Sequence, residues 1–182
     1  EVTLLGQNVN AYGKDLKDGS SFAQLLEAVA LTGIERIRFM TSHPWDFTDE
    51  MIEVIATHDN IMKYIHLPVQ SGSTEILKKM NRRYTKEQYL EKVQLIRKYF
   101  PNAGITTDII IGFPTETEED FNTLIEFIKR AKLFNAGFFA YSREEGTPAY
   151  KLEGQIKKGE KTKRLKKLYA IQKKIVKENN KE

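Results

Sequence analysis

Short runs of apolar, β-branched and aromatic residues alternate along this chain with longer stretches of helical periodicity. Five runs have the length of a strand: Val2–Leu5, Ile37–Met40, Tyr64–Val69, Ile105–Ile111 and Gly137–Tyr141. The segments between them are long enough for a helix, and this alternation predicts parallel βαβ units. Periodicity alone is compatible with part of a barrel and with a doubly wound open sheet.

The predicted helices begin at residues that can cap a first turn. Four hydroxyl residues precede helical stretches: Ser21, Thr48, Thr85 and Thr117. Gln24 and Gln88 follow the first and third of these at the spacing of a capping box. Acidic residues follow the other two, where they favour the positive end of the helix dipole. These signals support the predicted helix boundaries.

Every predicted strand is followed by a polar cluster. The clusters are Gln7, Asn8 and Asn10; Thr41, Ser42 and His43; Gln70, Ser71 and Ser73; Gly112 through Glu116; and Ser142 and Arg143. The carboxyl ends of parallel strands share one edge, so we expect these residues to converge in a single composite pocket. Amides and hydroxyls of this kind bind ligands through directed hydrogen bonds, but they also stabilise ordinary turns.

Two acidic residues near the fourth predicted strand are candidates for a site. Asp108 lies in an apolar run where an unpaired charge is costly to bury, so we expect it to point into the interior. It either joins a structural network with Thr106 or Arg38, or contacts a cofactor or substrate. Glu116 either supplies negative charge at a helix start or contacts substrate.

The three histidines do not form a metal motif. His43, His58 and His66 lack regular spacing and neighbouring carboxylate ligands, so we predict no zinc site. His43 precedes Pro44, which favours an extended backbone and a ring that faces the pocket. The sequence contains no nucleophile elbow, Walker loop or GxGxxG fingerprint, which disfavours hydrolase, P-loop and Rossmann functions.

Composition narrows the class of protein. A chain of 182 residues with 40% hydrophobic content can bury one sizeable core. No apolar run has the roughly 18 residues of a membrane span, and no basic-then-apolar leader is present, which favours a soluble, cytoplasmic protein. The chain has no cysteine, so it contains neither disulfides nor thiolate-bound metal.

A change in charge near residue 150 divides the chain into residues 1–150 and a tail of residues 151–182. The first part carries 17 Lys or Arg against 21 Asp or Glu, whereas the tail carries 12 against 4. Apolar residues recur in the tail near helical spacing, which predicts an amphipathic basic helix. This helix either packs on the first part with its lysines in solvent, or contacts nucleic-acid phosphates.

Five segments, taken together and in order, resemble the methylthiotransferase branch of the radical S-adenosylmethionine (SAM) enzymes. They are LLGQNVNAYG at 4–13, RIRFMTSHP at 36–44, HLPVQSGS at 66–73 with KKMNRRYT at 78–85, TDIIIGFPTETEEDF at 107–121, and YSREEGTPA at 141–149. The first two are most similar to enzymes that add a methylthio group to C2 of isopentenyladenosine beside the tRNA anticodon. Threonylcarbamoyladenosine in tRNA and a ribosomal-protein aspartate remain alternative substrates within the family.

The resemblance implies the carboxyl-terminal part of a partial (β/α)6, TIM-like barrel with five βα units. It implies SAM and two 4Fe–4S clusters as cofactors, the tRNA anticodon stem-loop as partner, and an electron donor such as flavodoxin or ferredoxin. Because the cluster ligands are cysteines and this chain has none, we expect an internal fragment that lacks the cluster loop, the preceding domain and a following RNA-binding domain. A natural cysteine-free relative, or a non-catalytic RNA-binding module, is the alternative.

The resemblance also implies roles for the polar residues. The predicted SAM contacts are Gln7, Asn8 and Asn10 near the methionyl end, Gln70, Ser71 and Ser73 near the ribose, Arg143 beside a carboxylate, and Asp108. The predicted substrate contacts are His43, Glu116, Arg82, Arg83, Lys163, Lys166 and Lys167. We expect the isolated chain to bind no stoichiometric cluster and to leave SAM uncleaved.

Overall fold

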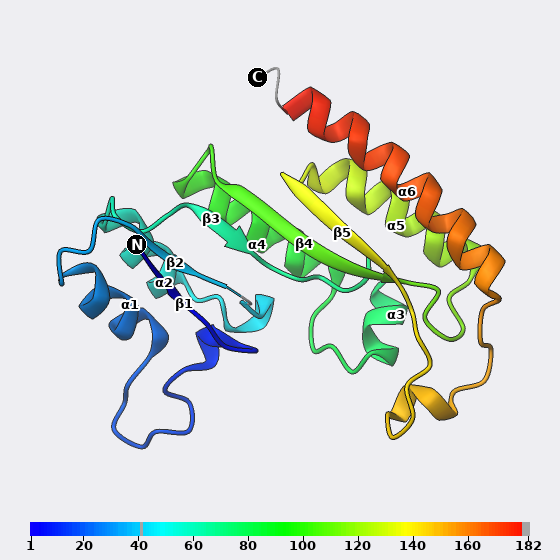
Figure 1. The fold of residues 1–182 in the computed structure, drawn as a ribbon, viewed down its shortest axis with the longest axis horizontal. Coiled ribbons are helices and arrows are strands. Elements are labelled where there is room, and N and C mark those ends of the chain that lie inside the picture. Colours follow the sequence, from blue (N-terminus) through cyan, green and yellow to red (C-terminus); the bar gives the residue numbers. More distant parts are fainter. Residues whose placement is uncertain (41, 180–182) are drawn as a thin grey trace. The chain divides into compact units, whose positions relative to one another are not determined.

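The computed structural model describes residues 1–40 and 42–179, in which strands and helices alternate (Figure 1). Thr41, predicted among the polar residues after the second strand, lies outside the described residues. The strands are β1 (Val2–Leu4), β2 (Ile37–Phe39), β3 (Tyr64–His66), β4 (Gly104–Ile111) and β5 (Asn135–Ala140). The α-helices are α1 (Phe22–Ala30), α2 (Asp49–Thr57), α3 (Thr74–Lys79), α4 (Lys86–Tyr99), α5 (Glu118–Ala131) and α6 (Lys158–Asn179). Three 3-10 helices are η1 (Val9–Ala11), η2 (Pro44–Asp46) and η3 (Pro148–Lys151).

Parallel pairing of the strands confirms the predicted βα repeats. β1 pairs with β2 in parallel, with Val2 opposite Ile37, and β3 pairs with β4 in parallel, with Tyr64 opposite Gly104. The strands form two sheets, of order β1–β2 and β3–β4–β5. Each parallel connection contains a helix, as the geometry of parallel strands requires.

The third strand is shorter than predicted, because Pro68 lacks the N–H that a sheet ladder requires. The backbone N–H of Leu67 still donates to the carbonyl of Thr106 at 2.8 Å. Beyond the proline, the N–H of Val69 donates to the hydroxyl of Thr107 at 2.9 Å instead of to a backbone carbonyl. Pairing with β4 resumes only at a single bridge between Gln70 and Ile109.

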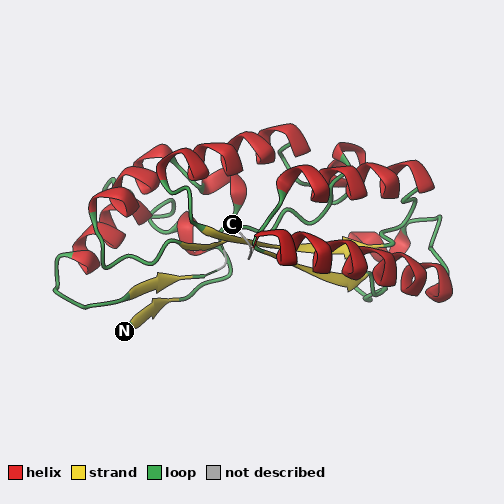
Figure 2. Ribbon diagram, turned by 90° about the horizontal axis from the view of Figure 1, so that it is seen from above, coloured by secondary structure: helices red, strands yellow, loops and turns green. Residues whose placement is uncertain are grey.

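The chain divides into two compact units, of which unit 1 comprises residues 1–68 and 91–106. Helices cover one face of β1 and β2 in this unit (Figure 2). Three aromatic rings join the strand and helix layers: Phe39 lies 5.7 Å from Phe22 and 6.5 Å from Phe47 between ring centroids. All three are almost completely buried, so they form the centre of this hydrophobic core.

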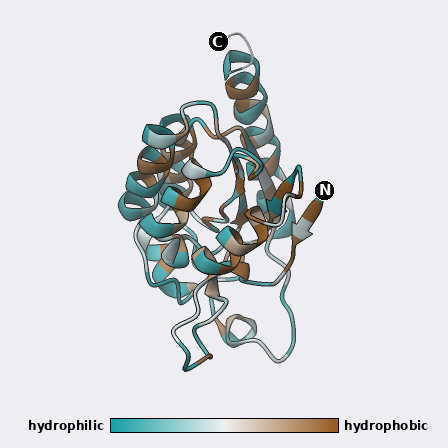
Figure 3. Ribbon diagram, turned by 90° about the vertical axis from the view of Figure 1, so that its left-hand side faces the viewer, coloured by the Kyte–Doolittle hydropathy of each residue, from teal (hydrophilic) through white to brown (hydrophobic). Residues whose placement is uncertain are grey.

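Unit 2 comprises residues 69–90 and 107–182, and includes α6. α6 lies beside α5 and β5 (Figure 1) and buries Leu168 and Ile175. The hydroxyl of Tyr169 donates to the carbonyl of Phe138 in β5 at 3.0 Å. Hydrophobic and hydrophilic positions both occur along this helix (Figure 3), and Leu168 and Ile175 are buried while Lys166 and Lys167 are exposed, so the amphipathic helix predicted for the tail is present.

The predicted caps occur as the sequence indicates. Capping boxes open α1 at Ser21 and α5 at Thr117, and Thr48 caps α2. Thr85 and Gln88 exchange side-chain and backbone hydrogen bonds of 2.9 and 3.2 Å at the start of α4. Among the described residues, no helix is both long and apolar enough to cross a membrane.

Candidate functional site

The loops that follow β1 and β2 in unit 1 are joined by one asparagine. The Asn10 amide nitrogen donates to the carbonyl of His43 at 3.0 Å, and its amide oxygen accepts from the His43 N–H at 2.8 Å. The His43 Nδ1 atom accepts from the backbone N–H of Trp45 at 3.3 Å and caps η2. Asn10 and His43 therefore hold two loops together, and their predicted ligand contacts stay predictions.

A second pair of contacts in unit 1 centres on Asp46. The Asn8 amide donates to one carboxylate oxygen of Asp46 at 2.7 Å, and the Lys14 ammonium donates to the other. Burial by itself raises the pKa of Asp46, but the hydrogen bonds from Lys14 and Asn8 outweigh it and hold that pKa below its usual range. The carboxylate thus remains charged and ties together residues from both loops.

Three buried oxygens near strand ends have unused hydrogen-bonding capacity. They are Asn8 Oδ1 after β1, Ser42 Oγ after β2 and Tyr141 OH after β5, and none has a hydrogen-bond partner among the described residues. Buried polar atoms are nearly always hydrogen-bonded in native proteins, so each exception calls for an explanation. Within each unit, these atoms occur where parallel α/β proteins bind ligands.

The end of β3 in unit 2 has an unusual backbone. Gln70 has a positive φ of 72°, which is uncommon for a residue other than glycine. Its N–H donates to the carbonyl of Asp108 at 2.9 Å. Ser71 is buried, and its hydroxyl accepts from the N–H of Ser73 at 3.2 Å. Ser73 caps α3 and donates to Asp120 Oδ1 at 2.6 Å. The hydroxyls of Ser71 and Ser73 thus shape the turn, and their predicted ribose contacts stay predictions.

Asp108 lies beside a glycine of β5. A Cβ atom on Gly137 would lie 2.6 Å from Asp108 Oδ1, so the absence of a side chain on β5 leaves room for this carboxylate. The two groups suggested for a network with it have other partners: Thr106 Oγ1 lies 2.9 Å from His66 Nδ1, and Arg38 pairs with Glu1 at 3.3 Å. A cofactor or substrate role for Asp108 stays a prediction.

Glu116 is part of a buried ion pair. Its Oε1 atom lies 2.6 Å from Arg164 Nη1, and both carboxylate oxygens accept from the N–H of Gly112 at 3.2 Å. Arg164 also contacts Glu118 at 3.4 Å and Glu160 at 3.1 Å. Burial raises the pKa of Glu116, while Arg164 and the Gly112 N–H act in the opposite direction. The carboxylate therefore fixes the turn after β4 to α6, and its predicted substrate contact stays a prediction.

The remaining predicted cations differ in their surroundings. Arg143 is exposed and donates a hydrogen bond to the carbonyl of Tyr150 at 2.8 Å. Its guanidinium group lies 4.3 Å from the centre of the Tyr150 ring. Arg82 and Arg83 lie in the turn between α3 and α4. The three predicted lysines of α6, Lys163, Lys166 and Lys167, are exposed. The last of these has its ammonium 5.5 Å from the centre of the Phe121 ring, so it also contributes to packing on α5.

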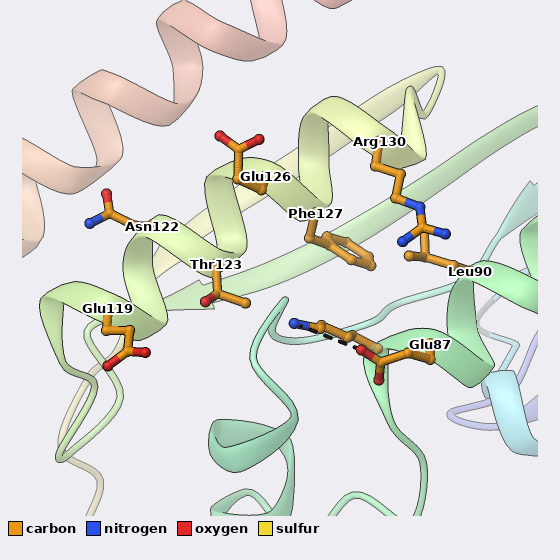
Figure 4. Close-up of a pocket in the computed structure, with 9 residues that line it drawn as sticks. Glu87, Leu90, Glu119, Asn122, Thr123, Glu126, Phe127 and Arg130 are labelled. Atoms are coloured by element: carbon orange, nitrogen blue, oxygen red, sulfur yellow. Dashed lines mark ion pairs between the residues drawn. The ribbon is translucent and has the colours of Figure 1, made fainter.

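A groove of about 550 Å³ lies between the start of α4 and the outer face of α5 (Figure 4). Its lining combines cations and acids, including Lys86 and Arg130 on one hand and Glu87 and Glu126 on the other. Lys86 pairs with Glu87 at 3.8 Å. None of the predicted site residues lines this groove, so its size does not make it the favoured site.

The donor set of this chain does not fit an iron–sulfur cluster but does fit SAM. The chain has no cysteine, and no group of three or more His, Asp or Glu residues among those described could hold a metal ion. SAM presents an amino acid, a ribose and an adenine, which bind through directed hydrogen bonds. The unpaired oxygens of Asn8, Ser42 and Tyr141 are groups of the kind that such a ligand requires.

The fold agrees with comparisons to known proteins. The chain belongs to the radical SAM superfamily, whose sequence model matches residues 1–128. Membership implies SAM and a 4Fe–4S cluster as cofactors, and it confirms the predicted family and the TIM-like βα fold.

More specifically, the chain is similar to tRNA-2-methylthio-N(6)-dimethylallyladenosine synthases. It is 54% identical to that of Clostridium tetani over 182 residues, which are 100% of this chain and 40% of the relative. It is also 54% identical to that of Thermotoga petrophila over 177 residues, or 96% of this chain and 40% of the relative. The chain thus spans about two fifths of the length of these relatives.

Two solved structures share the fold at low sequence identity. Coproporphyrinogen III oxidase from Escherichia coli has a TM-score of 0.65 at 15% identity, covering 84% of this chain and 36% of that one. The Elp3 protein of Methanocaldococcus infernus has a TM-score of 0.57 at 16% identity, covering 81% and 38%. These similarities concern the fold alone.

Sequence reasoning did not assign three residues that the structure brings to the strand ends, Asp46, Tyr141 and Arg164, and it gave Ser42 a place in the polar cluster but no specific role. Ser42 and Tyr141 lie in segments that carry the family resemblance, so those segments contained a signal for them. Asp46 and Arg164 had no such signal. Their partners are 38 and 48 residues away in sequence, at distances that no local pattern encodes.

Proposed function

We propose that this chain forms part of the catalytic barrel of a methylthiotransferase that acts on isopentenyladenosine in tRNA. The observation that carries the proposal is the pair of buried, unpaired oxygens that follow β1 and β2 in unit 1. The names of the relatives supply the substrate class, since each is a tRNA-2-methylthio-N(6)-dimethylallyladenosine synthase.

The residues of this chain bind and orient SAM. The proposed contacts are Asn8 Oδ1 and Ser42 Oγ, both in unit 1. When bound, SAM supplies a methyl group and, with a reduced cluster, the radical chemistry of the superfamily. Because the chain offers no thiolate, its contribution is to fix the reacting groups in position and to exclude water.

Binding of SAM tests this proposal. Nuclear magnetic resonance titration of the chain measures weak affinities, and we expect saturable shifts at Asn8 and Ser42. Ser42→Ala removes one hydrogen bond worth about 0.5–1.5 kcal/mol, so it should weaken the affinity by roughly 2- to 13-fold. Ser142→Ala alters an exposed hydroxyl in unit 2 and serves as the matched control. Equal affinities in all three proteins would refute the proposed SAM site.

We further propose that the lysines of α6 contact RNA phosphates. Lys163, Lys166 and Lys167 are exposed on a helix that is fixed to β5 and α5 on its other side. Such cations release counterions from RNA on binding, so the affinity depends on salt. The finer parts of the proposal are the anticodon stem-loop as the RNA element, two 4Fe–4S clusters held by residues outside this chain, flavodoxin or ferredoxin as electron donor, and a cytoplasmic location.

The salt dependence of RNA binding tests the role of α6. Replacing Lys163, Lys166 and Lys167 by glutamine should weaken binding and reduce the log–log salt slope by roughly 0.7–0.9 for each phosphate that the helix no longer neutralises. A matched control replaces three exposed lysines outside α6: Lys98, Lys129 and Lys151. An unchanged slope in the α6 variant would show that this helix only packs on β5.

A further inference from the structure

Two large aromatic side chains are exposed on the loops that follow β1 and β2 in unit 1. Trp45 has 59% of its surface exposed and Tyr12 has 44%. Both line one cleft of about 210 Å³. This volume is below the roughly 300–1,000 Å³ of pockets that take drug-sized ligands, so the cleft suits one small planar group.

The loops that carry these side chains are held in place by contacts already described. Trp45 lies in η2, whose start is tied to Asn10 through His43 and whose end is tied to Lys14 through Asp46. Gly13, next to Tyr12, has a φ of 90° and approaches the carbonyl of Ser20 so closely that a Cβ atom would clash with it. The two rings therefore sit on a pre-organised support, which lowers the entropy cost of binding.

The charges around the cleft favour a contact with the face of a ring over a contact with phosphate. The loop that follows Tyr12 carries Lys14 and Lys17 but also Asp15 and Asp18, and Lys14 is already paired with Asp46. Phosphate binding requires uncompensated positive charge, which this loop lacks. Indole and phenol rings instead provide stacking surfaces for unpaired nucleic-acid bases.

We propose that Tyr12 and Trp45, here called the aromatic platform, stack against an unpaired base of the RNA substrate. This inference rests on the proposed function, because it assumes that the chain binds RNA. It adds a second kind of contact to that function: the lysines of α6 bind phosphates, whereas the aromatic platform binds the face of a base. The two kinds of contact differ in their response to salt, so they can be separated by experiment.

Intrinsic fluorescence reports on the aromatic platform directly, because Trp45 is the only tryptophan in the chain. The chain is titrated with an RNA hairpin that has an unpaired loop, with a fully paired RNA duplex, and with SAM. Polarisation of labelled RNA measures total binding in parallel. We expect the hairpin to quench Trp45 with the same midpoint as the polarisation change, and the duplex and SAM to quench it weakly.

Substitutions measure how much the platform contributes. Trp45→Ala should weaken hairpin binding on the order of 5- to 150-fold, the range expected when one base no longer stacks, with an unchanged salt slope. Trp45→Phe should recover part of the affinity. Tyr99→Ala is the matched control, because Tyr99 is 48% exposed but ends α4 shortly before β4 begins, at the opposite ends of the strands. Circular dichroism confirms that each variant is folded.

The outcomes distinguish the inference from the function on which it rests. Hairpin binding by polarisation without quenching of Trp45, or equal quenching by SAM, would overturn the aromatic platform and leave RNA binding by α6 intact. No binding in either measurement would overturn both. Quenching that survives the replacement of the three α6 lysines would support the platform independently of that helix.

Discussion

The ion pair between Glu116 and Arg164 makes a measurable contribution to stability. Its nearest atoms are 2.6 Å apart, and the exposed side-chain fractions are only 7% for Arg164 and 2% for Glu116. Removing one partner of a buried pair leaves the other charge uncompensated, which destabilises a protein by about 3–5 kcal/mol. Arg164→Met keeps much of the length of the side chain and removes its charge, so the expected decrease is a large part of the roughly 5–15 kcal/mol of a typical domain.

Urea denaturation followed by circular dichroism measures this decrease as a lower midpoint at a constant m-value. Lys166→Met, at an exposed position of the same helix, should change the free energy of unfolding by no more than about 0.5 kcal/mol. The double variant Arg164→Met with Glu116→Gln tests the coupling, since the glutamine side chain carries no charge to leave unpaired. We expect the double variant to be less destabilised than the sum of the single changes by about 0.5–3 kcal/mol.

The pH dependence gives an independent check of this ion pair. Burial raises the pKa of Glu116, so the native state binds the proton more tightly than the unfolded state does. Removal of the Arg164 charge strengthens this effect, and the destabilisation of Arg164→Met should therefore decrease as the pH falls toward the raised pKa of Glu116. Strictly additive single changes, with a destabilisation that does not vary with pH, would refute the role assigned to the pair.

Three further changes follow from single contacts. Gly112→Ala should destabilise the protein more than Gly33→Ala does. Both glycines have positive φ, but of the two only Gly112 lies where a Cβ atom would clash with a neighbour, the Lys161 side chain. Equal midpoints in urea would contradict this. Tyr84→Phe should lower the free energy of unfolding by about 0.5–1.5 kcal/mol, because it removes the hydrogen bond from the Tyr84 hydroxyl to the carbonyl of Val69. Ultraviolet titration should show that the pKa of Tyr84 is raised to about 12, so the stabilisation is complete below pH ~10 and is lost above the folded-state pKa. A normal titration near 10 would exclude this. Asp46→Asn should have a lower free energy of unfolding than the parent at neutral pH. This difference should disappear as the pH falls below about 4, because the pKa of Asp46 is depressed in the folded state. A difference that persists in acid would disprove this.

The sequence predicted those parts of the fold that depend on local pattern. The five strands, the capped helices and the amphipathic α6 all occur, because their signals lie within a few residues of one another. The third strand is shorter than predicted because Pro68 outweighs the apolar run that contains it. The rule that an apolar run forms a strand therefore failed at Pro68, which has no backbone N–H to donate.

The candidate site was harder to predict, because its residues acquire partners from distant segments. Asn10 and Ser73 have the residue types expected of ligand contacts, yet their side chains hydrogen-bond to His43 and Asp120. Conversely, Arg164 resembles its lysine neighbours in a basic tail, but it is buried. Polar residue types indicate where a site lies along the chain, whereas only the tertiary structure shows which polar side chains keep an unsatisfied hydrogen-bond donor or acceptor.

The contact between Glu116 and Arg164 also determines when the turn after β4 can finish folding during synthesis. The two residues are 48 positions apart, and unit 2 joins residues 69–90 to residues 107–182. During synthesis the turn after β4 leaves the ribosome well before α6 does, and until then Glu116 cannot pair with Arg164. Contacts of long sequence separation form slowly and leave apolar surface exposed in the meantime. The nascent chain therefore carries an incomplete turn after β4 until α6 has been translated, which is the stage at which we expect it to require protection by chaperones.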